Sequence, residues 1–371
     1  MSQLILGLLP ILMTENERIV KSLMHLINNK ILPGGESDKD IRIGPLEIND
    51  FSICFWVEIH IANGRAKRSL YVKIPKADLY KKQKREILPL SDEDIKLAED
   101  EYNSLVYLSR CWCNDNIGVR FVKPLGFMKE YNAIITERFY AKHFFKMFKR
   151  SNLKNIFNKR NDATHHIMSR LGTALSIFHQ TTIKECEFNV GGVLQKIQNI
   201  CLQLKSFGID QKFMYRIVST LERSNKLEIT THYTNTLKGF DVRQVFIDKD
   251  GAIFLLDPGK MKTDYKEMDL ARFIVTCRIL YWGSMLFFLR VAPNISYEES
   301  FIKSYYGHNN KRLKRVLGLL IIKELLKHWR MAHIALGLKQ WPLLIKKILK
   351  KTYIDPFYKW QITNELVKLE S

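Results

Sequence analysis

One short segment near the middle of the chain has residue types and spacing that could do chemistry. Two apolar runs, 245–247 and 253–256, flank the turn Asp248-Lys249-Asp250-Gly251, which is the pattern of a β-hairpin. The second run leads into Asp257, which is followed by Pro258 and Gly259. A hairpin that ends in this corner holds a carboxylate still, in a position where it could bind a divalent cation. Asp before Pro-Gly is also a common structural turn, and the corner alone does not decide between these alternatives.

The composition limits the class of protein to which this hairpin belongs. At 371 residues the chain exceeds the usual size of one domain, and its 46% hydrophobic content is enough for a sizeable core, so two lobes are expected. Six scattered cysteines form no disulfide-like framework, and Cys111 and Cys113 lack further partners at zinc-site spacing. The apolar run 4–13 is too short to span a bilayer and is not shaped like a signal peptide. We therefore expect a cytoplasmic protein.

The net charge of +21 is unevenly distributed and predicts anionic partners. Residues 311–351 contain twelve Lys or Arg residues and one acid, Glu324. Apolar runs at 317–322 and 341–345 lie beside lysines, which favours interfacial helices that contact the inner face of an anionic membrane peripherally; alternatively, these residues complete a core. The stretch 142–160 interleaves Phe with Lys and Arg, which suits a membrane-surface helix or a groove for a phosphorylated ligand. Nucleic-acid binding is disfavoured because no zinc finger, helix-turn-helix or RNA-binding aromatic motif accompanies the charge.

The order of the predicted elements defines the fold class. Alternating patterns predict strands at 53–61, 69–75 and 131–139, and the helical spacing at 91–110 predicts a helix. Beyond residue 160 the chain is predicted to be chiefly helical apart from the hairpin at 244–257. This order predicts an α+β, bilobal protein kinase-like fold with a small β-rich N-lobe and a large, mainly helical C-lobe. The predicted regions are an N-terminal helical extension at 1–40, the N-lobe at 41–139, the C-lobe at 140–310 and a basic helical C-terminal region at 311–371.

Over roughly residues 40–275 the sequence resembles the aminoglycoside phosphotransferase and choline kinase-like family, relatives of protein kinases. The resemblance implies an enzyme that uses ATP and Mg²⁺. It implies that Lys73 binds the nucleotide phosphates and that Glu101 forms an ion pair with Lys73. It places Glu137 on the hinge strand, whose backbone binds adenine. It assigns Asp257 and Gln244 to the metal, with Asp257 also in a catalytic role.

Two further matches concern the support of the site. The segment Leu171 to His179 resembles the helix of the large lobe that ends in Leu-x-x-Leu-His, where we expect His179 to be a packed helix-end residue. The segment Asp269-Leu270-Ala271 resembles a helix start whose aspartate braces the catalytic loop, although a plain N-cap is an equal alternative.

The chain departs from the family pattern at the catalytic loop. The family has His-Gly-Asp, four residues and then Asn, whereas this chain has Leu237-Lys238-Gly239 and then Gln244. The usual proton-accepting aspartate therefore falls on Gly239, which has no side chain. Asp241 on the same loop and His232 just before it are the visible replacements. We favour Asp241 as the base, with a salt bridge to Arg243 or Lys238 as the alternative role.

Two functions follow from the sequence. The first is an ATP/Mg-dependent phosphotransferase acting on a hydroxyl of a small molecule, a sugar or a lipid-linked glycan, with an anionic or phosphorylated acceptor favoured by the charge. The second is a pseudokinase that binds a nucleotide or a partner with little or no catalysis, which the loss of the usual base favours. The acceptor is not encoded in any motif that we find.

Overall fold

The computed structural model describes residues 39–45, 47–49, 52–61, 67–76, 91–112, 117–148, 162–223, 230–282, 296–307 and 311–370. Nearly all of the predicted N-terminal extension and the predicted turn at 62–65 lie outside these residues. The chain divides into two compact units. The small unit comprises residues 1–113, 120–141 and 254–260, and the large unit comprises residues 114–119, 142–253 and 261–371.

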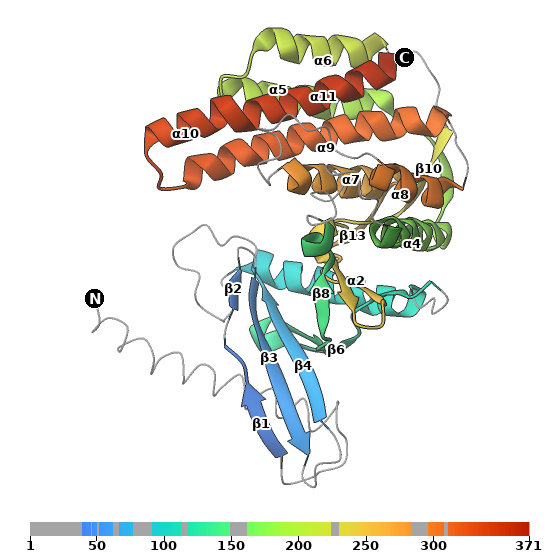
Figure 1. The fold of residues 1–371 in the computed structure, drawn as a ribbon, viewed down its shortest axis with the longest axis vertical. Helices are drawn as coiled ribbons and strands as arrows, with labels where there is room; N and C mark the ends of the chain where they lie inside the picture. Colours follow the sequence, from blue (N-terminus) through green and yellow to red (C-terminus); the bar gives the residue numbers. More distant parts are fainter. Residues whose placement is uncertain are drawn as a thin grey trace. The chain divides into compact units, whose positions relative to one another are not determined.

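The small unit is built on an antiparallel sheet of strand order β1-β3-β4-β7-β6, with β2 paired to β3 (Figure 1). The predicted strands are confirmed. Their bounds, with those of their neighbours, are β1 (Lys39–Ile43), β2 (Glu47–Asn49), β3 (Ser52–Ile61), β4 (Lys67–Pro75), β6 (Pro124–Met128) and β7 (Ala133–Glu137).

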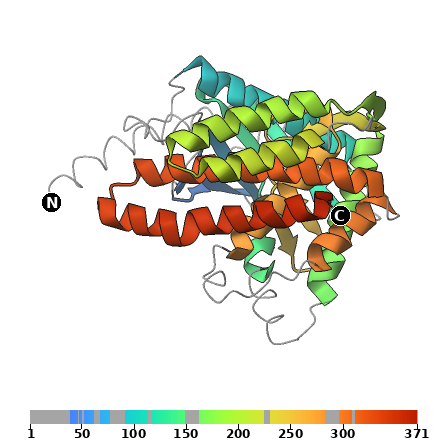
Figure 2. The ribbon, with the colours of Figure 1, turned by 90° about the horizontal axis from the view of Figure 1, so that it is seen from above.

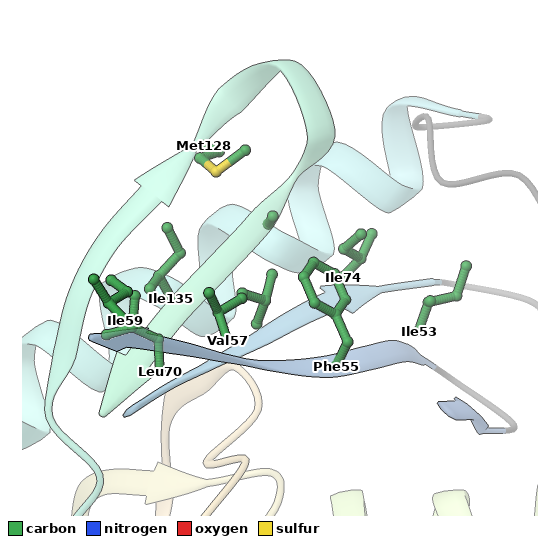
Figure 3. Packing of buried hydrophobic residues seen from close by; sticks show 10 residues of the cluster. Ile53, Phe55, Val57, Ile59, Leu70, Ile74, Met128 and Ile135 are labelled. Carbon is green, nitrogen blue, oxygen red and sulfur yellow. The ribbon is translucent and has the colours of Figure 1, made fainter. Parts of the chain in front are cut away.

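The core of the small unit follows from the period-two alternation along these strands. On β3 the side chains of Ile53, Phe55, Val57 and Ile59 are buried together with apolar residues of β4 and β7 (Figure 3). Each fully buried side chain of this size stabilises the fold by about 1.5–3 kcal/mol. This sheet is therefore a rigid support for the polar residues that it carries.

The predicted helix of the small unit is α2 (Asp92–Cys111), which packs against β4, β6 and β7. Ser91 caps its N-terminus by accepting a hydrogen bond from the Asp94 N–H at 3.3 Å. Ala98, Glu101, Leu105 and further residues at helical spacing are buried. Glu101 is thus a charged residue on the face of the helix that packs on the unit.

The large unit is mainly helical, and α9 runs through it in contact with α5, α7 and α11 (Figures 1 and 2). Its helices are α4 (Asp162–Gln180), α5 (Val190–Ser206), α6 (Gln211–Arg223), α7 (Glu267–Trp282), α8 (Ser296–Tyr306), α9 (Lys311–Leu338), α10 (Leu343–Leu349) and α11 (Asp355–Glu370). The apolar run 317–322 is buried inside α9, so for that run the alternative that these residues complete the core holds, and an interfacial helix is excluded.

Two other expectations about this unit are corrected. A three-stranded sheet of order β13-β10-β9 lies among the helices, where we predicted only the hairpin. Its strands are β9 (Lys184–Glu187), β10 (Thr230–Leu237) and β13 (Met261–Tyr265). In the stretch 142–160, Phe144 and Phe148 are buried in the core, so they do not form the apolar face of a surface helix, and residues 149–160 lie outside the described part.

The predicted hairpin is formed by β11 (Val245–Asp248) and β12 (Ile253–Leu255). Its turn is closed by a hydrogen bond from the Asp248 N–H to the Ala252 carbonyl at 3.1 Å, and Gly251 supplies the positive φ of 81° that the turn requires. Two short strands, β5 (Val119–Phe121) and β8 (Ala141–His143), complete the described β-structure. Among the described helices, none is both long and apolar enough to cross a membrane.

Candidate functional site

Three of the predicted site residues meet in the small unit. Lys73 lies on β4, and its Nζ is 2.7 Å from Oε1 of Glu101 on α2 and 2.9 Å from Oδ2 of Asp257. The strand, the helix and the end of the hairpin each contribute one of these residues. The structure therefore brings together residues that are far apart in the sequence, as the resemblance implies.

The electrostatics of this trio leave negative charge in excess. Burial lowers the pKa of Lys73, but the two carboxylates outweigh that effect and hold its pKa above the ordinary value, so the ammonium stays charged. Burial raises the pKa of Glu101, and the nearby Asp257 raises it further against the opposing effect of Lys73. One ammonium balances two carboxylates in a partly buried place. A cation that bound Asp257 would relieve this imbalance.

Asp257 is held in an uncommon backbone conformation. Its φ is 46°, in the left-handed region, and the nearby Gly259 also has a positive φ of 61°. For a residue other than glycine this region costs on the order of 1 kcal/mol or more, although Asp tolerates it better than most residues. Strain of this kind concentrates at functional sites, where the surroundings hold one side chain in one direction. The corner that the sequence predicts is therefore present, with its carboxylate aimed at Lys73.

Glu137 ends β7, and its side chain is exposed. Its backbone N–H donates to the Lys123 carbonyl at 3.2 Å, and the next N–H, of Arg138, donates to the Ser69 carbonyl at 2.9 Å. Both donors are used within the small unit. An adenine contact from Glu137 would therefore be made through its carbonyl oxygen.

In the large unit, the loop 238–244 follows β10 and is braced from α7. The Asp269 carboxylate is fully buried and accepts a hydrogen bond from the Leu237 N–H at 2.8 Å. Arg272, one turn further along α7, donates to Asp269 Oδ1 at 2.9 Å and also to the Leu237 carbonyl. The backbone at the start of the loop is thus fixed on both its donor and its acceptor. Asp269 acts as a brace, as the resemblance implies.

His179 supports the same brace from α4. Its Nε2 lies 3.2 Å from Asp269 Oδ2, and its Nδ1 lies 2.7 Å from the Tyr305 hydroxyl. Because a carboxylate only accepts, Nε2 carries the proton and Nδ1 accepts from Tyr305. His179 is a packed helix-end residue, as expected. Sequence reasoning missed Arg272 and Tyr305; the position of Arg272 three residues after Asp269 on a helix was the one available signal.

Asp241 forms a salt bridge with Arg243, which is the alternative to its role as the base. It is buried and caps a short 3₁₀ helix, Val242–Gln244, by accepting from the Arg243 N–H at 2.8 Å. The Arg243 guanidinium also donates to both of its carboxylate oxygens. A carboxylate that is held in this way has little free capacity to accept a proton from a substrate.

Of the other two predicted residues of the large unit, Gln244 lies on the loop 238–244 and His232 lies outside it. Gln244 ends the 3₁₀ helix and is partly buried, and its backbone N–H donates to the Asp241 carbonyl at 2.9 Å. His232 lies on β10, five residues before Leu237, which corresponds to about 17 Å along an extended strand. His232 is therefore not part of the loop.

A pocket of about 440 Å³ lies in the large unit beside β10. It is lined by Asn189, Gly192, Val193, Lys196, Tyr233, Lys262, Thr263, Asp264 and Tyr265. Lys262 pairs in register with Thr236, one residue before Leu237, so β10 connects the pocket directly to the braced loop. Burial lowers the pKa of Lys323, while the carboxylates of Glu324 and Asp264 raise it and Lys196 and Lys262 lower it by smaller amounts. Lys262 itself is ion-paired with Asp264, which also lines the pocket.

Comparison with solved structures identifies the fold. No family profile matches the sequence, and no curated protein is similar to it in sequence. The structure resembles glucosamine kinase in complex with glucosamine, ADP and inorganic phosphate, with 10% identity, a TM-score of 0.51, and coverage of 90% of this chain and 83% of that chain. Another crystal form of glucosamine kinase gives 12% identity, a TM-score of 0.50, and coverage of 88% and 78%. The choline kinase LicA from Streptococcus pneumoniae covers 95% of this chain and 99% of its own, with 12% identity and a TM-score of 0.47.

The chain has the α+β, bilobal protein kinase-like fold of small-molecule kinases. The structures that support this shared fold are those of glucosamine kinase, at TM-scores of 0.50 and 0.51.

Proposed function

We propose that this chain is an ATP- and Mg²⁺-dependent phosphotransferase that acts on a hydroxyl of a small, anionic, sugar-like acceptor. The observation that carries the proposal is the contact of Lys73 with both Glu101 and Asp257, at 2.7 and 2.9 Å. A lysine that a helix carboxylate holds in place is suited to nucleotide phosphates. The glucosamine kinase that shares the fold was solved with ADP, which supports a nucleotide as the ligand.

The residues present fit a magnesium ion. Asp257 in the small unit offers carboxylate oxygens, the hard ligands that Mg²⁺ takes beside phosphates. Gln244 stays the second ligand that the sequence resemblance implies. When bound, Mg²⁺ would neutralise charge on the transferred phosphoryl group. Glu101 would keep Lys73 extended toward the phosphates when Asp257 turns to the metal. The brace from Asp269 would keep the loop that carries Gln244 in position.

The acceptor is proposed to lie in the pocket beside β10. Lys196 and Lys262, which line the pocket, would balance a phosphate or carboxylate, and the Tyr233 and Tyr265 hydroxyls would bind sugar oxygens. Lipid-linked glycans are included among the acceptors because they combine sugar and phosphate.

The second candidate is a pseudokinase that binds nucleotide without efficient transfer. Gly239 lacks the carboxylate of the usual base, and Asp241 is engaged by Arg243. Phosphoryl transfer proceeds through a loose transition state in which positioning carries most of the catalysis, and a missing general base costs about 10²–10⁴-fold. We therefore expect slow transfer, and its complete absence favours the second candidate.

The test measures Mg-ATP binding by calorimetry and phosphoryl transfer to sugars, sugar phosphates, choline, ethanolamine and aminoglycosides. Asp257→Ala should abolish transfer and weaken Mg-dependent binding, whereas Asp250→Ala, in the exposed turn of the same hairpin, should do neither. Lys262→Gln should raise the KM for an anionic acceptor and leave the KM for ATP unchanged. Transfer that persists at the wild-type rate in Asp257→Ala would refute the mechanism, and binding without turnover for every acceptor would establish the pseudokinase.

A further inference from the structure

The turn between α9 and α11 presents large apolar side chains to solvent. We refer to residues 341–351, which include α10, as the α10 tip. Leu343 is 83% exposed, Leu344 67%, Ile348 50% and Trp341 48%. Among the side chains of α10, none is buried. Single exposed apolar residues are normal on a protein surface, but a contiguous group of this size marks an interaction site.

The α10 tip is also strongly basic. Lys346, Lys347, Lys350 and Lys351 fall within it, and the sequence has no acid between Glu324 and Asp355. At 100° per residue, Leu344, Ile345 and Ile348 lie within one arc of the helix, and the lysines lie on the opposite arc. Leu343, in the first turn, is the exception. The tip therefore combines an apolar face with a cationic face.

The base of the tip is held firmly by the large unit. The Asp355 carboxylate accepts from Trp329 Nε1 at 2.9 Å and lies 2.9 Å from His333 Nε2. The His333 ring stacks on Phe207 with centroids 5.1 Å apart, and Lys350 Nζ donates to the Phe207 carbonyl. Figures 1 and 2 show α10 at the turn end of the hairpin formed by α9 and α11. The apolar residues are thus presented on a fixed support and do not belong to a loose tail.

A second exposed stripe lies on the part of α9 that leads into the tip. Met331, Ile334 and Leu338 are all exposed and are spaced three and four residues apart, which places them along one side of the helix. Residues 316–322 of the same helix are buried in the core. The change from buried to exposed apolar residues within one helix shows that the apolar residues of α9 become exposed from Met331 onward, before the tip begins.

From these features we infer that the α10 tip is a membrane-binding element that inserts its apolar face into an anionic lipid surface. Leucine and isoleucine side chains would enter the acyl boundary, Trp341 would lie at the headgroup level, and Lys347 and Lys351 would contact anionic headgroups. A protein partner would need an acidic, apolar surface of matching shape, whereas an anionic bilayer supplies both properties at any orientation. This inference does not depend on the proposed phosphotransfer, because its readout is binding to lipid.

The experiment is flotation of the full chain with vesicles of phosphatidylcholine mixed with phosphatidylglycerol, compared with phosphatidylcholine alone. Binding should require the anionic lipid and should weaken with salt. Leu344→Asn with Ile348→Asn should lower partitioning at least tenfold. Lys347→Gln with Lys351→Gln should lower it by roughly fivefold per lysine at low salt. Trp341→Phe should remove the blue-shifted part of the tryptophan emission that appears on binding, which assigns the inserted segment.

Matched controls distinguish binding through the α10 tip from nonspecific binding through other exposed apolar or basic side chains. Leu202→Asn replaces a leucine on α5 that is 66% exposed, and Lys184→Gln with Lys129→Gln removes two exposed lysines elsewhere; neither should change partitioning. All variants should melt at the wild-type temperature, because they replace exposed side chains. Equal flotation of wild type and Leu344→Asn/Ile348→Asn would overturn the inference. So would a wild-type dimer that this double variant makes monomeric while neither protein binds vesicles, since the tip would then be a contact between copies.

Discussion

At the scale of single residues, the candidate site has an intact half, which would bind nucleotide and metal, and a depleted half, which lacks a free proton acceptor. Lys73, Glu101 and Asp257 make the contacts that hold a phosphate-binding lysine and a metal-binding carboxylate. In the other half, Gly239 has no side chain and Asp241 is occupied by Arg243. Binding and proton transfer are therefore separable in this chain, and each can be tested by its own substitution.

Replacement of Glu101 by Gln should weaken Mg-ATP binding by about tenfold or more, because a charge-assisted hydrogen bond of Lys73 is lost and Lys73 then pairs only with Asp257. The measurement is calorimetric titration with Mg-ATP. Glu99→Gln, an exposed change on the same helix, is the control and should leave the affinity unaltered. Equal affinities for the two variants would show that the pair has no role in nucleotide binding.

Replacement of Gly239 by Asp should raise the rate of phosphoryl transfer by about 10²-fold, because it restores a general base on a loop whose start is already fixed by Asp269. The rate is measured with saturating ATP and the best acceptor found. Gly239→Asn has nearly the same size but no basic carboxylate, so it should give no gain. A similar gain from both substitutions would attribute the effect to packing.

The sequence allows the three residues of the intact half to be predicted, because each stands in a recognisable local pattern and the resemblance connects them. It does not decide the role of Asp241. Whether a carboxylate reaches the guanidinium two residues later depends on the backbone dihedrals of one turn, which the residue types do not determine. The contact between Asp241 and Arg243 therefore had to be seen in the structure.

At the scale of elements, the apolar alternation of β3 and β4 predicts the sheet of the small unit well, whereas β10 escapes prediction. The buried positions of β10 include Thr231, Thr234 and Thr236, which give no hydrophobic periodicity. Their hydroxyls are satisfied instead: that of Thr234 donates to the His179 carbonyl at 2.9 Å. A strand whose core face is polar and hydrogen-bonded cannot be recognised by an apolar pattern.

The helix α9 should make stability depend on pH through His328. Burial lowers the pKa of His328 to about 4, against about 6.5 when it is unfolded. Because the folded pKa is the lower one, the neutral ring contributes stability that is present above pH 6.5 and is lost as the pH falls toward 4. The loss should be on the order of 1–3 kcal/mol.

Urea unfolding at about pH 7.5 and at about pH 5 measures this effect. The wild type should lose more stability between the two pH values than His328→Gln does. The same substitution at the exposed His166 should leave the wild-type difference in place. A His328→Gln variant with the full wild-type pH dependence would contradict the assignment to His328.

At the scale of the whole molecule, the basic C-terminal region is a structural part of the large unit except at the α10 tip. Arg278 on α7 is buried and contacts Glu298 on α8 at 2.7 Å and Glu365 on α11 at 2.8 Å. Composition shows that this region is basic, but the division between buried and exposed apolar residues depends on which neighbouring helices cover each turn. For this reason the sequence does not show that the apolar run 317–322 is buried whereas the apolar run 341–345 is exposed.

Arg278→Gln should destabilise the large unit by about 3–5 kcal/mol, because it removes the cation that pairs with the buried Glu298 and leaves the buried Glu365 with only Lys368. The measurement is the midpoint of urea unfolding. Lys368→Gln removes a cation that contacts Glu365 from the exposed side and should cost less than about 1 kcal/mol. Comparable losses for the two variants would mean that Arg278 is better hydrated than its position indicates.

The same buried arginine has a consequence for synthesis of the chain. Glu365 follows Arg278 by 87 residues, so Arg278 is made long before this carboxylate exists. Domains fold as they emerge from the ribosome, at roughly 5–20 residues per second. For several seconds after its synthesis, Arg278 on α7 therefore lacks the Glu365 carboxylate that pairs with it in the folded chain. During this interval the growing chain exposes an unfinished core and is a natural client for chaperones. A chain that ends within the basic stretch before α11 would thus lack Glu365 and keep Arg278 paired with Glu298 alone.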